Sequence, residues 1–248
     1  MKYYYGHEQQ YQRRLKEGQV AWDAGAYEEF DMLPAIQKFL ADSSFTAASP
    51  RVLDLGCGTG ALAVFLAQRG FEVVAVDISP SAIEEARKQS IVRKTKVEFC
   101  VADICDLNLP GASFELITDN HFLHCIVYDE ERKSVLSKIH ALLKPGGQYW
   151  IETMVGHPDM KPRPEWHLDA EGISWVFLDG KSKMDGCVIK DGHLCLPIRR
   201  IRNTAGVLVD EIQRAGFELL WQETLPPKDE NDTGWFRATC VKHRGDKK

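Results

Sequence analysis

The chain has 248 residues, of which 44% are hydrophobic and 27% charged, and its formal net charge is −5 at pH 7. This length supports a full hydrophobic core, while no unbroken apolar run approaches the 18 or so residues that a membrane-spanning helix needs. The scattered Lys and Arg argue against DNA as a partner, and seven cysteines without paired spacing, with no apolar signal segment, indicate a reducing cytoplasm.

Residues 1–45 are expected to form an N-terminal helical segment, and residues 46–153 a core in which β-branched runs alternate with amphipathic segments. That alternation is typical of a parallel sheet with crossover helices. The predicted strands are Arg51–Leu55, Glu72–Val76, Val97–Val101, Phe114–Thr118 and Gln148–Thr153.

Two helix starts are marked within this core. Ser79 followed by Pro80 predicts an N-cap with the favoured first-turn proline, and Asp129 is expected to cap a helix that ends at "ALLKPGG". The buried face of that second helix is predicted to consist of Val135, Leu136, Ile139, Leu142 and Leu143.

Residues 154–204 exceed what such a core needs and are expected to form an insertion after the fifth strand, with its own small sheet. "ISWVFLDG" predicts one strand, and Asp191-Gly192 predicts a two-residue hairpin turn between two more. The run "IRRIR" at 198–202 could hold an anion, although a solvated strand or helix edge is the favoured interpretation.

Other side chains of the insertion leave two interpretations open. Trp166, Trp175 and Phe177 could line a pocket or pack the insertion onto the core. A metal site at Cys187, His193 and Cys195 matches no standard ligand spacing, so no metal is expected. Residues 205–248 then predict a helix and two antiparallel strands, "FELLWQE" and "GWFRATCVK".

The stretch "VLDLGCGTGALA" at 52–63 carries the strongest functional signal. A glycine turn between a buried strand and a helix presents backbone N–H groups at the carboxyl edge of the sheet, where ligands of open α/β sheets bind. Gly56, Gly58 and Gly60, with Asp77 after the second strand, would also suit a dinucleotide. Asp54 argues against a pyrophosphate and favours a cationic ligand.

Taken together and in order, "VLDLGCGTG", "VVAVDIS", "VADICDL", "FELITDN" and "LLKPGG" resemble the class I S-adenosylmethionine-dependent methyltransferases. The resemblance implies an α/β, Rossmann-like, seven-stranded, mostly parallel sheet with helices on both faces, and S-adenosylmethionine over the carboxyl ends of its first strands. It also implies the cofactor contacts: Asp54, Gly56 and Gly58 around the methionine moiety, Asp77 at the ribose, Asp103 and Ile104 at the adenine, and Asp119 and Asn120 beside the methyl group. Cys57, Gly60 and Ile78 are expected as further cofactor-binding residues.

The same resemblance leaves the acceptor open. In-line methyl transfer needs alignment more than a catalytic group. His121, ahead of His124, is nominated as a base for a protonated acceptor, although packing at a helix start is the favoured interpretation of both histidines. A short likeness to thiol, halide and thiopurine methyltransferases nominates Tyr11, Trp22 and Tyr27 as residues that cover the cofactor.

The expected activity is methylation of a small molecule by a monomer or homodimer, with the insertion on the acceptor side. Two alternatives stay open: a protein or RNA methyltransferase, which "IRRIR" and the insertion could serve, and a non-catalytic nucleotide-binding module.

Overall fold

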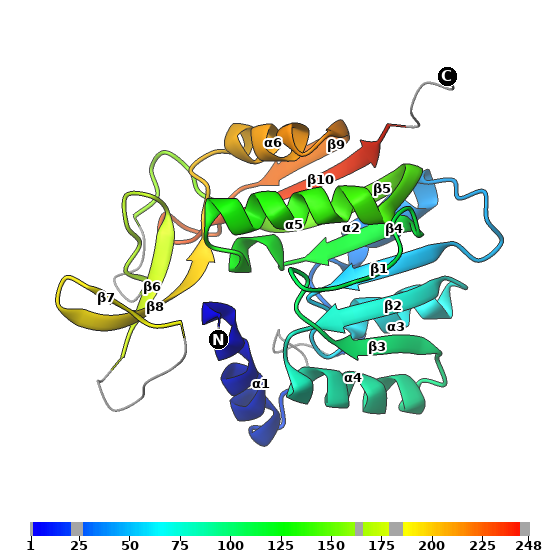
Figure 1. Cartoon of the computed structure of the whole chain (residues 1–248), viewed down its shortest axis with the longest axis horizontal. Helices are drawn as coiled ribbons and strands as arrows, with labels where there is room; N and C mark the ends of the chain where they lie inside the picture. Colours follow the sequence, from blue (N-terminus) through cyan, green and yellow to red (C-terminus); the bar gives the residue numbers. More distant parts are fainter. Residues whose placement is uncertain (1, 21–26, 162–165, 179–185, 244–248) are drawn as a thin grey trace.

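A computed structural model describes residues 2–20, 27–161, 166–178 and 186–243 of the chain. Its centre is a seven-stranded sheet in the order β3-β2-β1-β4-β5-β10-β9, in which β10 runs antiparallel to both of its neighbours (Figure 1). The predicted fold class is therefore confirmed. The strands are β1 Arg51–Leu55, β2 Glu72–Asp77, β3 Val97–Val101, β4 Phe114–Asn120, β5 Leu143–Val155, β9 Phe217–Leu225 and β10 Gly234–Lys242.

Helices cover both faces of this sheet. Apolar side chains of α2 (Leu33–Asp42), α3 (Ala61–Gln68) and α4 (Pro80–Val92) form one core cluster, and those of α5 (Asp129–Leu142) and α6 (Ala205–Arg214) belong to another. Val135, Leu136, Ile139, Leu142 and Leu143 are all buried, as their spacing predicts. Burial of these two faces is the main force that holds the layers together.

Helix boundaries follow the sequence at α4 and depart from it at α5. Ser79 is the N-cap of α4 and its hydroxyl accepts a hydrogen bond from the amide of Ala82 at 3.0 Å. The expectation that Asp129 caps α5 is wrong, because Tyr128 holds the cap position and the helix starts at Asp129 itself. The Asp129 carboxylate instead pairs with Arg202 at 2.9 Å.

The segment expected to form an insertion contains a second, three-stranded sheet in the order β6-β8-β7, formed by β6 Ile173–Phe177, β7 Val188–Lys190 and β8 His193–Arg200. Its first two expected residues, 154 and 155, belong to β5 instead. The predicted hairpin turn is confirmed: Asp191 and Gly192 join β7 to β8 with φ of +51° and +78°, the positive values that a type I′ turn requires. Trp175 and Cys195 of this sheet are buried in the same cluster as α5.

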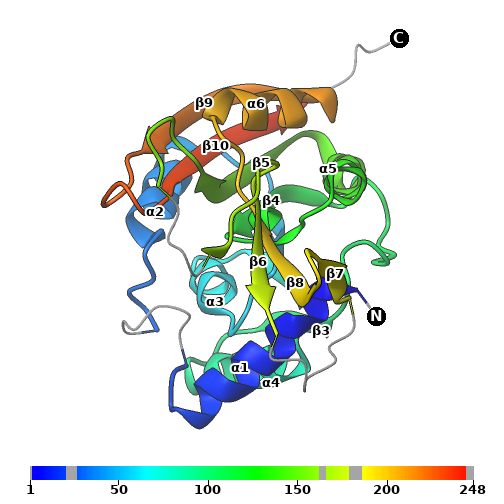
Figure 2. The same cartoon turned by 90° about the vertical axis from the view of Figure 1, so that its left-hand side faces the viewer.

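The N-terminal helix α1 (Gly6–Lys16) lies beside this small sheet and in front of the carboxyl ends of the central strands (Figure 2). Glu8 fastens it to the start of α4: its carboxylate accepts hydrogen bonds from the Ser79 hydroxyl at 2.5 Å and from the Ser81 hydroxyl at 2.6 Å. Just before it, the 3-10 turn η1 (Tyr3–Tyr5) contacts β8. No helix within the described residues has the length and apolarity to cross a membrane.

Candidate functional site

A cavity of about 200 Å³ opens at the carboxyl ends of the central strands, beneath α1 and beside β8. It brings together most of the residues that the sequence nominates, from four separate stretches of chain. These are Asp54, Gly56, Cys57, Gly58, Asp77, Ile78, Asp103, Ile104, Asn120 and His121. Trp22 lies outside the described residues.

The glycine turn is held by the carboxylate at the end of β2. Asp77 accepts a hydrogen bond from the amide of Gly58 through one oxygen and from the amide of Ser79 through the other, both at 2.8 Å. Burial raises the pKa of Asp77 to about 6 although these amides lower it. Gly58 has a φ of +54°, and a side chain there would meet the hydroxyl of Tyr11 at 2.5 Å. The turn thus needs glycine both for its conformation and for its closeness to α1.

Asp54 offers the clearest acceptor for a ligand. Its side chain is buried and one oxygen accepts a hydrogen bond from the Thr118 hydroxyl at 2.8 Å. The other oxygen has no hydrogen-bond partner among the described residues, and the same holds for Oδ1 of Asn120. Burial raises the pKa of Asp54 to about 7. A buried acceptor of this kind is costly unless a donor arrives, so the site suits the cationic amino-acid part of a cofactor.

Asp103 is already engaged by the N-terminal residues. One of its oxygens accepts hydrogen bonds from Lys2 at 2.9 Å and from the Tyr4 hydroxyl at 2.7 Å, and the other accepts from the amide of Cys105 at 2.8 Å. Burial raises the pKa of Asp103, but these hydrogen bonds outweigh it and the pKa is lowered. Each carboxylate oxygen has two lone pairs, so the adenine role of Asp103 stays open as a prediction.

Two residues expected to contact the cofactor, Asp119 and Gly60, are not part of the cavity lining, and their cofactor roles stay predictions. Asp119 does not line the cavity: β4 continues through Asn120, and the buried Asp119 carboxylate accepts hydrogen bonds from the amide of Phe122 and the hydroxyl of Tyr149. Gly60 also lies outside the lining, and a side chain there would meet Ala86 and Phe99 at 3.0 Å.

Of the covering residues that the sequence nominates, Tyr11 lines the cavity and Tyr27 does not. The Tyr27 hydroxyl instead donates a hydrogen bond to the carbonyl of Thr59 at 2.9 Å. Cys57 faces the cavity, but burial raises the pKa of its thiol well above the usual value. It is therefore a small filler and no nucleophile.

His121 follows directly after the end of β4 and has a φ of +66°. Its Nε2 lies 2.8 Å from Oε1 of the buried Glu152, and its ring stacks on Trp235 with centroids 4.1 Å apart. The second oxygen of Glu152 pairs with Arg237. Burial raises the pKa of Glu152, yet the hydrogen bonds from His121 and Arg237 prevail and lower it.

The groups around His121 also include the donor atoms of a possible cation site, since Asp31, His121 and Glu152 each place one potential ligand atom within 4.8 Å of the others. Both Glu152 oxygens, however, are already used by His121 and Arg237. The arrangement therefore favours orientation of the imidazole over metal binding.

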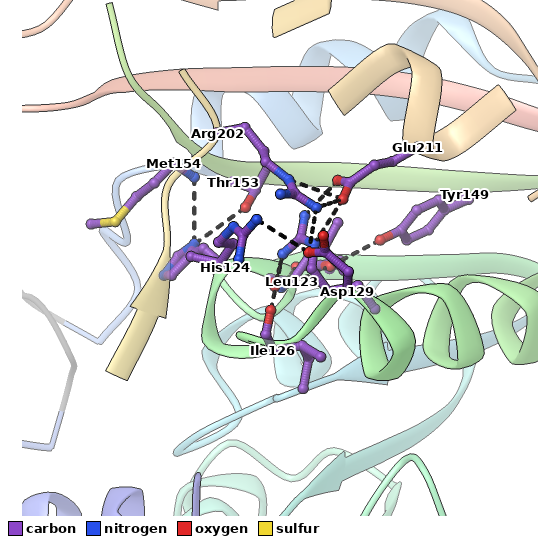
Figure 3. Close-up of polar contacts among 12 residues, drawn as sticks. Leu123, His124, Ile126, Asp129, Tyr149, Thr153, Met154, Arg202 and Glu211 are labelled. Atoms are coloured by element: carbon purple, nitrogen blue, oxygen red, sulfur yellow. Dashed lines mark hydrogen bonds and ion pairs between the residues drawn. The ribbon is translucent and has the colours of Figure 1, made fainter. Parts of the chain in front are cut away.

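His124 also reaches the cavity but is more deeply buried. Its Nδ1 lies 3.3 Å from the Thr153 hydroxyl and accepts a long hydrogen bond from the amide of Met154, both on β5 (Figure 3). Burial, with smaller contributions from His121 and Arg199, lowers the pKa of His124 well below the usual value. His124 is thus a neutral, packed histidine.

Three residues of the cavity carry no sequence signal that pointed to a ligand site: His7 of α1, Met154 of β5 and Trp235 of β10. A fourth, Arg199 of β8, belongs to the "IRRIR" run, which the sequence offered only as a whole as a place for an anion. Periodicity could have nominated Trp235 and Met154 as strand residues, but only the tertiary packing brings them to the carboxyl edge.

The aromatic residues nominated from the insertion fall elsewhere. Trp166, Trp175 and Phe177 do not line the cavity, so the pocket interpretation is wrong and the packing interpretation is confirmed for Trp175. The favoured solvated-edge interpretation of "IRRIR" is also wrong. Arg200 is 8% exposed, and Arg202 pairs with Glu211 and with Asp129 (Figure 3).

Comparisons with known proteins agree with this geometry. A family model described as a methyltransferase domain matches residues 52–147. The chain is 33% identical over 147 residues to an uncharacterized methyltransferase of Mycobacterium tuberculosis, which covers 59% of this chain and 69% of that protein. It is 34% identical over 178 residues to an O-methyltransferase of Pyrenophora dematioidea, covering 68% of this chain and 64% of the relative.

Among solved structures, the chain is similar to the 1,6-didemethyltoxoflavin-N1-methyltransferase of Burkholderia thailandensis, which holds 1,6-didemethyltoxoflavin and S-adenosylhomocysteine. The TM-score is 0.61 at 18% identity, and the match covers 95% of this chain and 87% of that one. At this identity the likeness speaks for the fold.

Proposed function

Because the chain belongs to the class I S-adenosylmethionine-dependent methyltransferases, we propose that it methylates a small molecule bound in the same cavity as the cofactor. S-adenosylmethionine, when bound, supplies a methyl group on a positively charged sulfur. A lone pair of the acceptor can attack the methyl carbon in line with the carbon–sulfur bond, so that the sulfur is the leaving group. The names of two similar proteins, an O-methyltransferase and a toxoflavin-precursor N-methyltransferase, support an acceptor of small size.

The observation that carries this proposal is that residues from outside the central sheet line the cavity. Tyr4, His7 and Tyr11 of the N-terminal segment and Arg199 of the insertion line the same cavity of about 200 Å³ as the glycine turn. A cavity lined in part by the N-terminal segment and by β8 suits a small ligand that fits inside it better than a loop of RNA or a protein tail. The acidic composition, with a net charge of −5, points the same way.

Within this cavity we assign the cofactor to the side lined by the glycine turn. Asp54 would accept hydrogen bonds from its ammonium group, Asp77 from its ribose hydroxyls and Asp103 from its adenine amino group. The unpaired oxygen of Asp54 supports the first assignment. Asn120, whose Oδ1 likewise lacks a partner among the described residues, would lie beside the reacting centre.

The acceptor would then lie between His121, Trp235 and Met154. If it carries a proton on the attacking atom, the His121 imidazole takes that proton as the new bond to the methyl carbon forms. Glu152 acts as a positioning residue, since its carboxylate holds the imidazole at 2.8 Å and stabilises the imidazolium that results. With S-adenosylmethionine bound, the products would be the methylated acceptor and S-adenosylhomocysteine.

The proposed function is tested by determining which molecules of a cell extract receive a labelled methyl group. The purified protein is incubated with methyl-labelled S-adenosylmethionine and separate low- and high-molecular-mass fractions of a cell extract, with heat-treated protein as the control. We expect the label in the low-mass fraction. Transfer confined to RNA or protein would contradict the proposal, and RNA binding whose log affinity falls steeply with log salt would then identify the RNA alternative.

A further inference from the structure

We propose that Arg199 binds a carboxylate group of the methyl acceptor, so that the enzyme selects small organic acids. This inference rests on the proposed function, because it places the acceptor in the cavity described above. It adds a specificity-determining residue on the side of the cavity away from the glycine turn.

The strand geometry of β8 sends its consecutive arginines in different directions. Successive side chains of a strand point to opposite faces, and the buried Arg200 lies 3.3 Å from the Asp129 carboxylate at the start of α5. Arg199 points the other way and lines the cavity. It forms no ion pair or hydrogen bond with any residue that the structure describes.

A half-buried guanidinium without a counterion is unusual in this molecule. Arg132, Arg202 and Arg237 all pair with carboxylates, and each of these three is mostly buried. Removing a cation from water without a partner carries a free-energy cost that a bound anion would relieve. Arg199 therefore has the surroundings of a ligand-binding residue rather than of a structural one.

The neighbours of Arg199 can donate or accept hydrogen bonds without adding charge. Burial, with a contribution from Arg199, lowers the pKa of His7 to about 4, and the pKa of His124 is also lowered by burial and by nearby cations. Both imidazoles are thus neutral near pH 7. Arg199 is the one Arg or Lys among the described residues that line the cavity.

The charges of the cavity are unevenly placed. Three of its acidic residues, Asp54, Asp77 and Asp103, lie on the side of the glycine turn, where they attract the cationic groups of the cofactor and repel an anion. The fourth, Asp31, lies 3.8 Å from Nε2 of His121. Arg199 supplies the positive charge of the cavity lining. A single planar guanidinium matches a carboxylate by paired N–H···O bonds, and one positive charge balances a monoanion better than a phosphate.

The experiment uses benzoate and benzamide, which have similar shape and differ in charge, as probes of the protein saturated with S-adenosylhomocysteine. Binding is measured by ¹H–¹⁵N NMR titration for the parent protein, for Arg199→Met and Arg199→Lys, and for Arg214→Met as a matched control. Arg214 is an exposed arginine on α6. Thermal unfolding verifies that each variant is folded.

We expect the parent and Arg214→Met to bind benzoate at least about tenfold more tightly than benzamide. This ratio matches the free energy that one hydrogen bond to a charged group contributes. Arg199→Met should bind both probes equally, and Arg199→Lys should keep part of the preference. Equal binding of the two probes by the parent, or a preference that survives in Arg199→Met, would overturn the inference.

One rival is that Arg199 holds the carboxylate of the cofactor itself. Calorimetry with S-adenosylhomocysteine separates the two, because our inference expects Arg199→Met to keep the parent affinity within about twofold, whereas a loss of about tenfold or more would support the rival. The proposed function is tested independently by the labelling experiment. Small-molecule methylation without any preference for acids would leave that function standing and refute only the role of Arg199.

Discussion

The Nε2 atom of His121 lies 2.8 Å from Oε1 of Glu152, across the ends of two adjacent parallel strands. Glu152 stands opposite Asn120 in the register of β4 and β5, and Arg237 of β10 binds its other oxygen. The imidazole is therefore held by a hydrogen bond to the ion-paired carboxylate of Glu152 and by stacking of its ring face on Trp235. This gives a histidine at the cavity wall a fixed orientation, which a general base needs.

Replacing His121 by Ala should lower turnover about 10²-fold or more if the acceptor is protonated, because the base is lost. The acidic limb of the pH–rate profile should disappear, while affinity for S-adenosylhomocysteine stays within about twofold. Steady-state rates and calorimetry on one variant measure all three. Thr153, which bonds the buried His124, supplies the comparison: Thr153→Val should lower stability without moving the pH profile. An acidic limb that persists in His121→Ala would refute the base assignment.

Asp54 should make both stability and cofactor binding depend on pH. Its pKa of about 7 in the fold exceeds the unfolded value of about 4, so the folded chain binds more protons between these values. The stabilising effect of that proton is complete below about pH 4 and is lost as the pH rises toward about 7. The parent should therefore lose stability relative to Asp54→Asn across this range, by up to about 1.4 kcal/mol per pH unit.

The same group should make affinity for S-adenosylhomocysteine rise with pH until about 7, because the ammonium group requires an ionised Asp54. Chemical denaturation and calorimetry at several pH values test the two effects. The exposed Asp210 provides the control variant Asp210→Asn, which should follow the parent. Parallel pH profiles for the parent and Asp54→Asn would show that this carboxylate does not govern binding.

Asp77→Asn should weaken S-adenosylhomocysteine binding by roughly 2 to 4 kcal/mol. The amide presents one acceptor oxygen where the carboxylate presents two, so the hydrogen bonds to the ribose and to the turn at Gly58 cannot all be kept. Calorimetry on Asp77→Asn is compared with Asp106→Asn, a change at an exposed aspartate beside Lys2. An unchanged affinity in a folded Asp77→Asn protein would remove Asp77 from the ribose site.

Glu8→Gln should speed release of S-adenosylhomocysteine severalfold, because the charged hydrogen bonds that fasten α1 to Ser79 and Ser81 become weaker. Tyr11, on the same helix, lies directly over Gly58, so a loosened helix uncovers the glycine turn. Stopped-flow displacement gives the rate. Glu17→Gln, at the exposed end of α1, should behave as the parent; equal rates for all three proteins would mean that α1 does not gate the cavity.

The first strands of the central sheet could be predicted because β1 and β2 are short apolar runs that are almost entirely buried. Strand β9 is largely exposed and carried a weaker signal. Local signals were equally informative at two other places. A short-range hydrogen bond determines the helix cap at Ser79, and positive φ angles determine the turn at Asp191-Gly192. They failed at Asp129, whose carboxylate is drawn to Arg200 and Arg202, two residues far away in the chain. Ion pairs between residues distant in the chain, and not the local capping preference, therefore account for the role of Asp129.

The candidate site shows the same limit. The acidic residues Asp54, Asp77 and Asp103 lie at or just after the carboxyl ends of β1, β2 and β3. Such ends share an edge in any parallel sheet, so their convergence follows from the topology. Asp119 looked equivalent, but β4 runs two residues further than predicted and the alternation of a strand turns this side chain away from the cavity. Arg199 could not be distinguished from Arg200 and Arg202 until the register of β8 was known.

The most direct test of the proposed cofactor and acceptor sites is a crystal structure of the protein with S-adenosylhomocysteine. We predict that the nucleoside lies along Asp77 and Asp103, that the ammonium group meets the unpaired oxygen of Asp54, and that the sulfur faces His121. The Arg199 guanidinium should remain available to the acceptor. Density with the cofactor carboxylate on Arg199, or with the nucleoside outside the cavity of the glycine turn, would contradict this assignment.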